Sequence, residues 1–315
     1  KPMVAMVHNI VGLQHATMGI YNAWTSRTPV IVMGGTGPSD TSKRRPGIDW
    51  VHTALVQGEQ VRDYVKWDDQ PASIESISES FIRAYRLATL EPKAPVYLCY
   101  DVALQEQKMN QAMPIPDLAA YPPSLPLQAP EEGFEKTMEA LFESRRPVII
   151  ADTAGRTEEA FTALTELAEL FSIPVLDQGG RLNFPTLHPF NLSGLRKEAL
   201  SQADLILAVD VPELAGALAG APSKAKIIHI HLNELLVRSW SHDYDKLAKV
   251  NLSILAESRI FLPELLRRLR KEKRTLAKIR QTIAERAIEI KKLRSKHQES
   301  IRQETQKKWN EKPIS

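Results

Sequence analysis

The segment Pro147–Asp177 reads PVIIADTAGRTEEAFTALTELAELFSIPVLD and holds the pattern that decides the fold. It begins with an apolar run of strand length, Pro147–Asp152, and Glu158–Phe171 then repeats apolar residues at helical spacing. A second apolar run, Pro174–Asp177, follows the helix. Strand, helix and strand in this order predict a right-handed crossover between two parallel strands.

The same alternation surrounds this segment. A helix is expected over Phe134–Glu143, and two further apolar runs, Asp204–Asp210 and Lys226–His231, have the length and composition of strands. Strands that alternate with helices predict a parallel sheet covered by helices on both faces.

The beginning of the chain has a similar pattern. The apolar run Lys1–His8 is predicted to be a strand buried on both faces, because parallel sheets contain such strands. Gly12–Ser26 has helical spacing, and Pro29–Met33 forms the next strand. Gly34–Gly37 closes that strand and is interpreted as a tight turn.

A third strand and its helix complete this first α/β region. Val65–Trp67 is a short extended piece, Pro71–Leu90 is a predicted helix with Ser73 as a possible N-cap, and Pro95–Tyr100 is an apolar strand. The apolar stripe of the helix consists of Ile74, Ile77, Phe81, Ala84 and Leu87.

Proline content marks the boundary between the two regions. Six prolines lie between Pro114 and Pro130, and proline removes the backbone donors that helices and sheets need. We therefore predict the α/β fold class with two Rossmann-like parallel-sheet domains, residues 1–112 and 132–262, joined by a linker over 113–131.

The remaining segment, residues 263–315, is predicted to be helical. Apolar residues recur at steps of mostly three, four or seven among charged ones, which predicts one or two long amphipathic helices. These residues are Leu266, Leu269, Leu276, Ile279, Ile283, Ile290, Leu293 and Ile301. A basic arm for nucleic acid is the alternative, but several glutamates interrupt the positive charge, which favours a solvated connector helix.

Composition limits the classes of function. The chain has 315 residues, 43% of them hydrophobic, and a net charge of +3 with the basic excess in Arg267–Lys308, so we expect a folded protein without a nucleic-acid partner. The single cysteine, Cys99, lies in an apolar run and is expected to be a buried reduced thiol, which favours a cytoplasmic location. No apolar run approaches the ~18 residues of a membrane span, so no membrane association is expected.

The strand over Lys1–His8 opens the chain without an initiator methionine or a preceding turn. A buried parallel strand rarely stands alone at the start of a domain. We therefore expect the sequence to be part of a longer protein.

Ligands of open α/β sheets bind beyond the carboxyl ends of the strands. His8 and Asn9 hold that position after the first strand, and an imidazole there could transfer a proton or donate a hydrogen bond. The alternative is a strand-end histidine bonded to a backbone carbonyl, and the spacing alone favours it. His15 falls on the following helix, with a smaller chance of function.

Other candidate motifs are weaker. Gly34–Gly37 follows a strand, where glycine N–H groups could approach an anion, but its spacing is neither that of the dinucleotide fingerprint nor that of the P-loop. Asp152 and Asp210 end strands and could bind a ribose or a metal, although caps of the next element are expected more often. The sequence has no Cys/His set with zinc spacing and no Gly-x-Ser-x-Gly elbow.

Several segments in order resemble thiamine-diphosphate enzymes, with the strongest likeness to benzoylformate decarboxylase and acetolactate synthase. In the first region they are Val11–Trp24 (VGLQHATMGIYNAW), Pro29–Gly35 (PVIVMGG), Val65–Ser73 (VKWDDQPAS) and Ala94–Leu98 (APVYL). In the second they are Arg146–Ala151 (RPVIIA), Ile173–Leu176 (IPVL), Asn183–Pro189 (NFPTLHP) and Asp204–Val209 (DLILAV). The resemblance runs from Lys1 to about Pro263 and implies the latter part of the pyrimidine-binding domain, the central domain and a connector to a third domain.

The resemblance implies a chemistry. In the family a glutamate bonds the aminopyrimidine of thiamine diphosphate, and the cofactor's ring accepts the electrons released when a 2-keto acid loses carbon dioxide. That glutamate precedes the strand with which this chain begins, and the Gly-Asp-Gly motif that holds magnesium and diphosphate does not occur in the sequence. We expect this piece to be inactive alone, and the complete protein to bind thiamine diphosphate and magnesium as a homodimer or homotetramer.

The resemblance also implies site residues. His8 matches the position of an active-site histidine of benzoylformate decarboxylase, and Gly12, Gln14 and His15 match a loop that lines thiamine. The chain has Ile10-Val11-Gly12 where the synthases have Gly-Pro-Gly.

A second pair of positions bears on the kind of reaction. His52 and Thr53 align with a Phe-Gln pair of acetolactate synthase, which weakens a synthase assignment. Flavin-binding glycine segments are not apparent near Leu192–Gly194 or Asp210–Leu214, so FAD is not expected.

Two function classes remain beside this one. The first is a non-catalytic nucleotide-binding or regulatory α/β protein that uses Gly34–Gly37 and the strand ends of the second domain. The second is an interaction module based on Leu262–Trp309. Which 2-keto acid is used, and whether it is decarboxylated or joined to another molecule, does not follow from the sequence.

Overall fold

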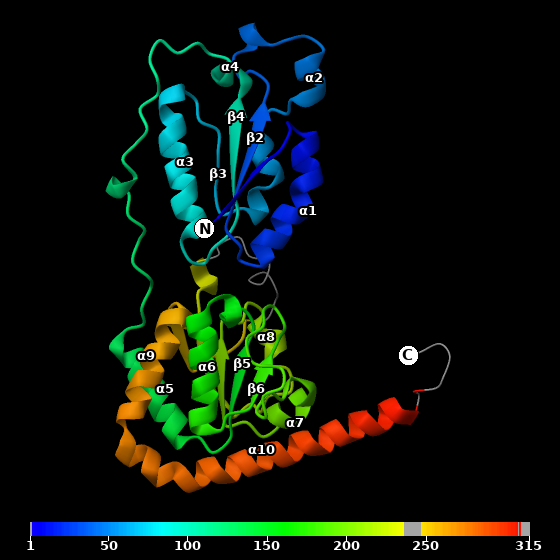
Figure 1. Ribbon diagram of the computed structural model, residues 1–315, viewed down its shortest axis with the longest axis vertical. Coiled ribbons are helices and arrows are strands. Elements are labelled where there is room, and N and C mark those ends of the chain that lie inside the picture. The colour runs from blue at the N-terminus through cyan, green and yellow to red at the C-terminus, as the bar shows by residue number, and fades with distance from the viewer. Residues whose placement is uncertain (1, 236–246, 308, 310–315) are drawn as a thin grey trace. The chain divides into compact units, whose positions relative to one another are not determined.

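A computed structural model describes residues 2–235, 247–307 and 309 of the chain. The chain folds into two compact units, whose helices and strands are labelled in Figure 1. The first unit comprises residues 1–125 with 234–243, and the second comprises 126–233 with 244–315. Two parallel sheets, one in each unit, confirm the predicted α/β class.

The first unit is a sheet of four parallel strands in the order β1-β2-β4-β3. The strands are β1 (Met3–Met6), β2 (Val30–Thr36), β3 (Asp68–Asp69) and β4 (Val96–Asp101). Helices α1 (Val11–Thr25) and α3 (Ile74–Thr89) cover its two faces, as Figure 1 shows. The first unit has two small hydrophobic cores, and alternate residues of β4 belong to different ones. Tyr97 packs in one core with residues of α1, and Leu98 packs in the other with residues of α3.

Strand β1 lies at the edge of this sheet and pairs with β2. The prediction of a strand buried on both faces is wrong, because Met3 and Met6 are 66% and 79% exposed. An edge strand has a neighbour on one side only, so its apolar composition does not ensure burial. The prediction of parallel pairing is confirmed by the register Met3–Val30 to Met6–Met33.

Gly34–Gly37 is not a tight turn, because β2 continues through Gly34, Gly35 and Thr36. These glycines instead allow side chains of neighbouring segments to approach the strand backbone closely. A Cβ at Gly34 would lie 2.4 Å from the hydroxyl oxygen of Tyr97, and one at Gly35 would lie 2.7 Å from Oδ1 of Asn9. Glycine here makes room for side chains of neighbouring segments.

The other predictions for the first unit agree with the structure. Ser73 is the N-cap of α3, and its hydroxyl accepts the N–H of Ser76. Val65–Trp67 is extended, since Lys66 N–H donates to Pro95 and Tyr97 N–H donates to the Trp67 oxygen. The short elements are η1 (Thr41–Lys43), α2 (Ile48–His52), η2 (Gln57–Gln60), η3 (Arg62–Tyr64), α4 (Val102–Gln105) and η4 (Leu118–Ala120).

The second unit is a sheet of five parallel strands in the order β6-β5-β7-β8-β9. The strands are β5 (Pro147–Ala151), β6 (Val175–Asp177), β7 (Leu205–Val209), β8 (Lys226–His231) and β9 (Leu252–Leu255). The pattern of apolar runs predicted the first four and missed β9, whose four residues include the polar Ser253. Every residue of β5 and β7 is buried, which is the expected state of central parallel strands.

Helices and short 3-10 segments accompany this sheet. The helices are α5 (Glu131–Glu143), α6 (Glu158–Phe171), α7 (Arg196–Leu200), α8 (Leu214–Ala217), α9 (Ser258–Lys271) and α10 (Lys273–Lys307), and the 3-10 segments are η5 (Ala154–Arg156), η6 (Ser193–Leu195) and, after β8, η7 (Asn233–Leu235). Helix α6 has the predicted bounds. The prediction of one or two long amphipathic helices is confirmed by α9 and α10, which are separated at Glu272.

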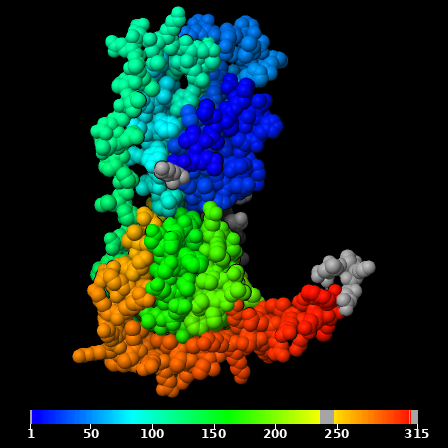
Figure 2. All heavy atoms as spheres, viewed as in Figure 1, coloured from blue at the N-terminus to red at the C-terminus, as the bar shows by residue number. Residues whose placement is uncertain are grey.

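Helix α10 packs on the second unit through one stripe. Arg286 and Ile290 are buried, and Leu276, Ile279, Ile283 and Leu293 pack against the same core. Beyond this stripe Gln298–Lys307 is exposed throughout, and Figure 2 shows this end of the helix in red. Among the described helices, none combines the length and the apolar character needed to cross a lipid bilayer.

Candidate functional site

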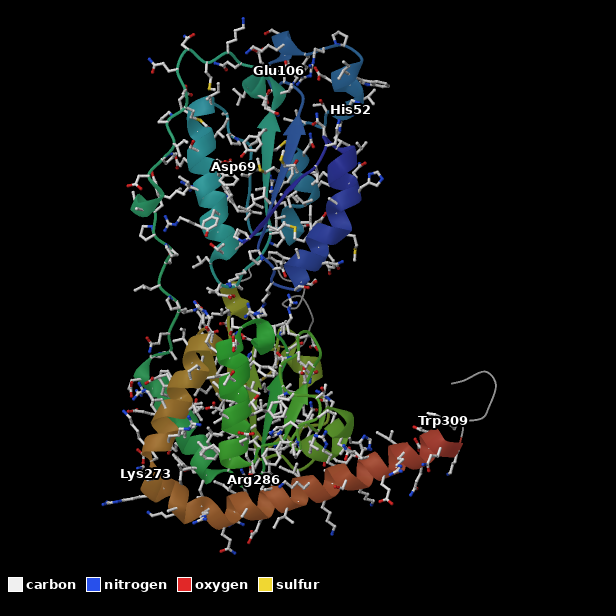
Figure 3. The ribbon with its side chains drawn as sticks, in the orientation of Figure 1. His52, Asp69, Glu106, Lys273, Arg286 and Trp309 are labelled. Atoms are coloured by element: carbon white, nitrogen blue, oxygen red, sulfur yellow. The ribbon has the colours of Figure 1, made fainter. Side chains whose placement is uncertain are left out.

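The candidate site lies where β1 ends. His8 is exposed in the turn between β1 and α1, and its Nδ1 lies 3.1 Å from the backbone oxygen of Asn9. The His8 ring also meets the ring of His52 edge-on, with 5.2 Å between the ring centroids. The structure therefore joins the two histidines, although they lie far apart in the sequence. His52 ends helix α2 and is labelled in Figure 3.

The turn after His8 has an unusual backbone. Ile10, the N-cap residue of α1, has φ 45° and ψ −72°. A β-branched residue at positive φ costs about 1–3 kcal/mol and needs support from its surroundings. Gly12 lies against this turn, since a Cβ there would be 3.0 Å from the Cβ of His8. Glycine at position 12 thus lets the first turn of α1 close on His8.

Gln57 supports this turn, and no sequence pattern identified it. Its side chain is 2% exposed. Its Oε1 accepts the N–H of Ile10 at 3.0 Å, and its Nε2 donates to the backbone oxygen of Gly35 at 2.8 Å. A single glutamine in an irregular segment carries no local signal of such a role, so only the three-dimensional contacts could reveal it.

Thr53 connects the α2 segment to the end of β2. Its hydroxyl accepts the N–H of Gly37 at 3.2 Å, and a Cβ at Gly37 would collide with that hydroxyl oxygen at 2.2 Å. The adjacent His52 is half-buried, and its enclosed Nδ1 has no hydrogen-bond partner among the described residues. An enclosed imidazole nitrogen of this kind can hydrogen-bond a polar group of a ligand.

Gln14 and His15 are exposed on the first turns of α1. His15 Nδ1 lies 2.7 Å from the oxygen of Val11 in its own helix. Within the described part of the chain, no hydrogen bond or ring contact joins Gln14 or His15 to His8 or His52. The structure therefore brings His8, Gly12 and His52 together, with Thr53 next to His52 in the chain, and leaves Gln14 and His15 exposed on α1.

The site offers two imidazole rings that could hydrogen-bond part of a cofactor such as thiamine diphosphate. The enclosed nitrogen of His52 and the exposed imidazole of His8 are the available groups, and Gly12 is packed closely against His8. A diphosphate needs a cation or basic groups. Over residues 2–235, 247–307 and 309, no group of three His, Cys, Asp or Glu side chains is placed to hold a metal ion.

The strand ends of the second unit carry acidic residues that bond within the unit. Asp152 Oδ1 accepts the N–H of Gly180 at 2.9 Å. Asp210 is fully buried, its carboxylate accepts the hydroxyl of Ser258, and Arg156 lies 3.5 Å from it. These contacts favour a structural role for both aspartates over ligand binding.

Asn183 ties the carboxyl ends of β5 and β6 together. It is fully buried. Its Nδ2 lies 2.6 Å from the backbone oxygen of Asp152 and 2.7 Å from Oδ1 of Asp177, and its Oδ1 accepts the N–H of Gly155 at 2.8 Å. At the ends of β5 and β6, where ligands of α/β sheets often bind, the polar groups therefore bond within the unit itself.

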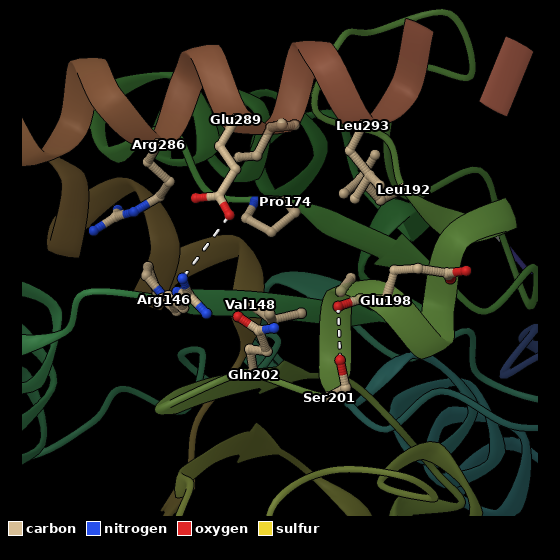
Figure 4. A pocket seen from close by; sticks show the side chains of 13 residues that line it. Arg146, Val148, Pro174, Leu192, Glu198, Ser201, Gln202, Arg286, Glu289 and Leu293 are labelled. Atoms are coloured by element: carbon tan, nitrogen blue, oxygen red, sulfur yellow. Dashed lines mark hydrogen bonds and ion pairs between the residues drawn. The ribbon is translucent and has the colours of Figure 1, made fainter. Parts of the chain in front are cut away.

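A cavity of about 290 Å³ lies at the opposite edge of this sheet, beside the amino ends of β5 and β6 (Figure 4). Pro147, Pro174 and Ile290 are among its apolar lining residues. On its rim Arg146 and Glu289 approach to 3.9 Å. Because helix α10 forms one wall, the cavity belongs to the seam between α10 and the sheet.

Comparison with known proteins relates the chain to one family. Residues 134–265 match the family model "Thiamine pyrophosphate enzyme, central domain". Benzoylformate decarboxylase of Pseudomonas aeruginosa is 27% identical over 234 residues, which are 67% of this chain and 40% of the relative. A probable acetolactate synthase large subunit of Methanocaldococcus jannaschii is 27% identical over 300 residues, 90% of this chain and 47% of the relative.

A solved structure has a similar fold. The crystal structure of benzoylformate decarboxylase from Polynucleobacter necessarius superposes with a TM-score of 0.68 at 20% identity, over 85% of this chain and 49% of that chain. The chain thus spans about half the length of the relatives it matches. The chain is therefore similar to thiamine pyrophosphate enzymes, and residues 134–265 match the model of their central domain.

Proposed function

We propose that the chain is part of a thiamine-diphosphate-dependent enzyme that decarboxylates a 2-keto acid or joins it to a second carbonyl compound. The observation that carries the proposal is the extent of the similarity to the probable acetolactate synthase, which spans 300 residues and therefore enters both units. The relatives named above include both a decarboxylase and a synthase, so both reaction types are retained.

His8 is the proposed catalytic residue. It is exposed at the carboxyl end of β1, where ligands of α/β sheets bind, and imidazole exchanges protons near neutral pH. Its role would be to give a proton to the carbonyl oxygen of the keto acid, or to take it back. Bound thiamine diphosphate would supply the sink for the electrons released with carbon dioxide.

The proposed thiamine-lining residues are Gly12, Gln14, His15, His52 and Thr53. Contacts around His8 support three of them, because Gly12 lets the first turn of α1 pack closely against His8, His52 meets its ring, and Thr53 is anchored to the end of β2. The enclosed Nδ1 of His52 would gain a partner from a polar group of the cofactor. Gln14 and His15 would close the solvent side.

We further propose that the complete protein uses magnesium with the diphosphate, requires no FAD, and forms a homodimer or homotetramer in the cytoplasm. Asn183 bonds the ends of β5 and β6 to each other, which supports a structural role for that unit. The buried, reduced Cys99 is compatible with a reducing compartment.

Calorimetric titration tests the proposed function. Thiamine diphosphate is titrated, with and without Mg²⁺, into this chain and into the complete product of its gene. We expect very weak binding by this chain and magnesium-dependent binding by the complete product, which should then release carbon dioxide from a 2-keto acid. Absence of binding by the complete product would disprove the proposal.

Adenine nucleotides provide the contrasting ligand. Tight binding of ATP or ADP by this chain, without thiamine diphosphate binding by the complete product, would instead support the nucleotide-binding alternative.

A further inference from the structure

The turn that carries His8 needs an external support. Ile10 has a positive φ of 45°, which isoleucine rarely adopts. A backbone in such a conformation persists when the surrounding structure imposes it. His8 lies two residues before Ile10, and a Cβ at Gly12, two residues after it, would lie 3.0 Å from the Cβ of His8. A change of conformation at Ile10 would therefore move both His8 and the start of α1.

Gln57 supplies this support from a separate segment. Its side chain is 2% exposed and bonds at both ends, to the N–H of Ile10 at 3.0 Å and to the oxygen of Gly35 at 2.8 Å. Gly35 belongs to β2, next to β1 in the sheet. The amide thus bridges the strained turn to a regular strand, and a buried amide that lost either bond would leave polar groups unsatisfied.

We propose that Gln57 is a positioning residue that holds His8 against His52 by locking Ile10 in its positive-φ conformation. The inference rests on the proposed function only in assigning His8 a proton-transfer role. It adds to that function a residue that touches neither substrate nor cofactor. Without Gln57, Ile10 would relax to negative φ, and the imidazole of His8 would leave its edge-on contact with His52.

The chain offers a matched control and a rescue. Gln60 lies in the same 3-10 helix as Gln57 but is exposed, so Gln60→Met makes the same chemical change without touching the turn. Ile10→Gly removes the steric penalty of positive φ, because glycine adopts that region freely. In the double variant Ile10→Gly with Gln57→Met, the turn should keep its conformation although the hydrogen bond from Ile10 N–H to Gln57 is missing.

The primary measurement is NMR of the full chain with ¹³C-labelled histidine, in which eight histidines are observed. Substitution of His8 and of His52, one at a time, assigns their ring signals. We expect a ring-to-ring nuclear Overhauser effect between them that is lost in Gln57→Met, kept in Gln60→Met and regained in the double variant. Persistence of this effect in folded Gln57→Met would overturn the proposal.

If Gln57→Met does not fold, amide hydrogen exchange of the unaltered chain decides the question. Ile10 N–H should exchange slowly because Gln57 accepts it, whereas Val11 N–H, in the first turn of α1, has no intrahelical acceptor and should exchange fast. Equally fast exchange of the two amides would contradict the proposal that Gln57 holds the N–H of Ile10.

Kinetics of the complete gene product separates the two proposals. If His8 transfers the proton, Gln57→Met should lower kcat by about tenfold to a hundredfold, with recovery in the double variant. A complete product that is inactive on every 2-keto acid, while the histidine contact still depends on Gln57, would refute the proposed function and leave the positioning role intact.

Discussion

Arg286, on helix α10, donates from its guanidinium to the backbone oxygen of Phe171, the last residue of α6. The same guanidinium donates to the oxygens of Ser144 and Arg145, just beyond the end of α5. The carbonyl groups at helix C-termini lack partners and carry partial negative charge. One buried cation therefore fastens α10 to two helices of the second unit, although burial lowers its pKa to about 10. Arg286 is labelled in Figure 3.

Replacement of Arg286 by leucine should destabilise the second unit. Three carbonyl groups would lose their donor in a site that water reaches poorly, so we expect a loss of about 3 kcal/mol in the free energy of unfolding. Urea denaturation followed by circular dichroism measures this loss. Arg280→Leu is the matched control on an exposed position of the same helix and should change stability little. Equal effects of the two substitutions would refute the role of Arg286.

Glu264 on α9 should make stability depend on acid pH. Hydrogen bonds from Arg267 and Arg268 lower the pKa of its carboxyl to about 2, against an ordinary 4.5. Because the pKa is lower in the folded state, the stabilisation is complete above about pH 4.5 and is lost as the pH falls toward 2. Its magnitude is about 1 kcal/mol, since the pair is partly solvated.

The comparison of wild type with Glu264→Gln tests this window. The difference in unfolding free energy should be constant between about pH 5 and 7 and shrink below about pH 4.5. Glu299→Gln, at an exposed position on α10, serves as control and should show no such trend. A difference that stays constant down to about pH 2 would exclude Glu264 as the source.

The contact between Gly34 and Tyr97 predicts a compensating pair of substitutions. A Cβ at position 34 would lie 2.4 Å from the Tyr97 hydroxyl oxygen and 3.0 Å from two ring carbons. Gly34→Ala should therefore destabilise the first unit by about 1–3 kcal/mol through overpacking. In the background of Tyr97→Phe the cost should become smaller, which thermal unfolding of all four chains measures. Additive effects would show that the two residues do not compete for this space.

The prediction on catalytic activity concerns His8. In the complete gene product, His8→Ala should lower kcat for the 2-keto acid by about 10²-fold or more, the usual contribution of a general acid or base. Thiamine diphosphate affinity should change little, because His8 is proposed to act on the substrate. His297→Ala, on α10, is the control histidine. An unchanged kcat in His8→Ala would contradict the catalytic role. His8 would then be a structural strand-end histidine whose ring lies near the backbone oxygen of Asn9.

Local pattern predicted most of the strands and long helices of the second unit, although it missed β9. Helix α6 has the bounds that its periodicity indicates, and β8 coincides with Lys226–His231. The apolar residues of these segments are largely buried, so the apolar pattern and the observed environment agree. The same reasoning failed for β1, where Met3 and Met6 are exposed, because a run of apolar residues does not reveal whether the strand lies at an edge.

Part of the candidate site was also predictable. His8 was expected at a strand end, and the resemblance implied Gly12 for the same site; the structure places the two residues close together, and their roles stay predictions. Gln57 was missed because its partners, Ile10 and Gly35, lie 47 and 22 residues away in the sequence. Gly34 and Gly35 were misread as a turn, since the side chains that require glycine there, Tyr97 and Asn9, come from other segments.

The sequence by itself determined the alternation of strands and helices and the class of the two sheets, because these depend on the spacing of apolar residues along the chain. The family likeness came from the resemblance of ordered sequence segments and not from that spacing. Tertiary structure alone decided which strand lies at an edge, which glutamine supports a strained isoleucine, and which arginine holds α10. Those features arise from contacts between distant segments, where burial and hydrogen bonding depend on the neighbour that folding supplies.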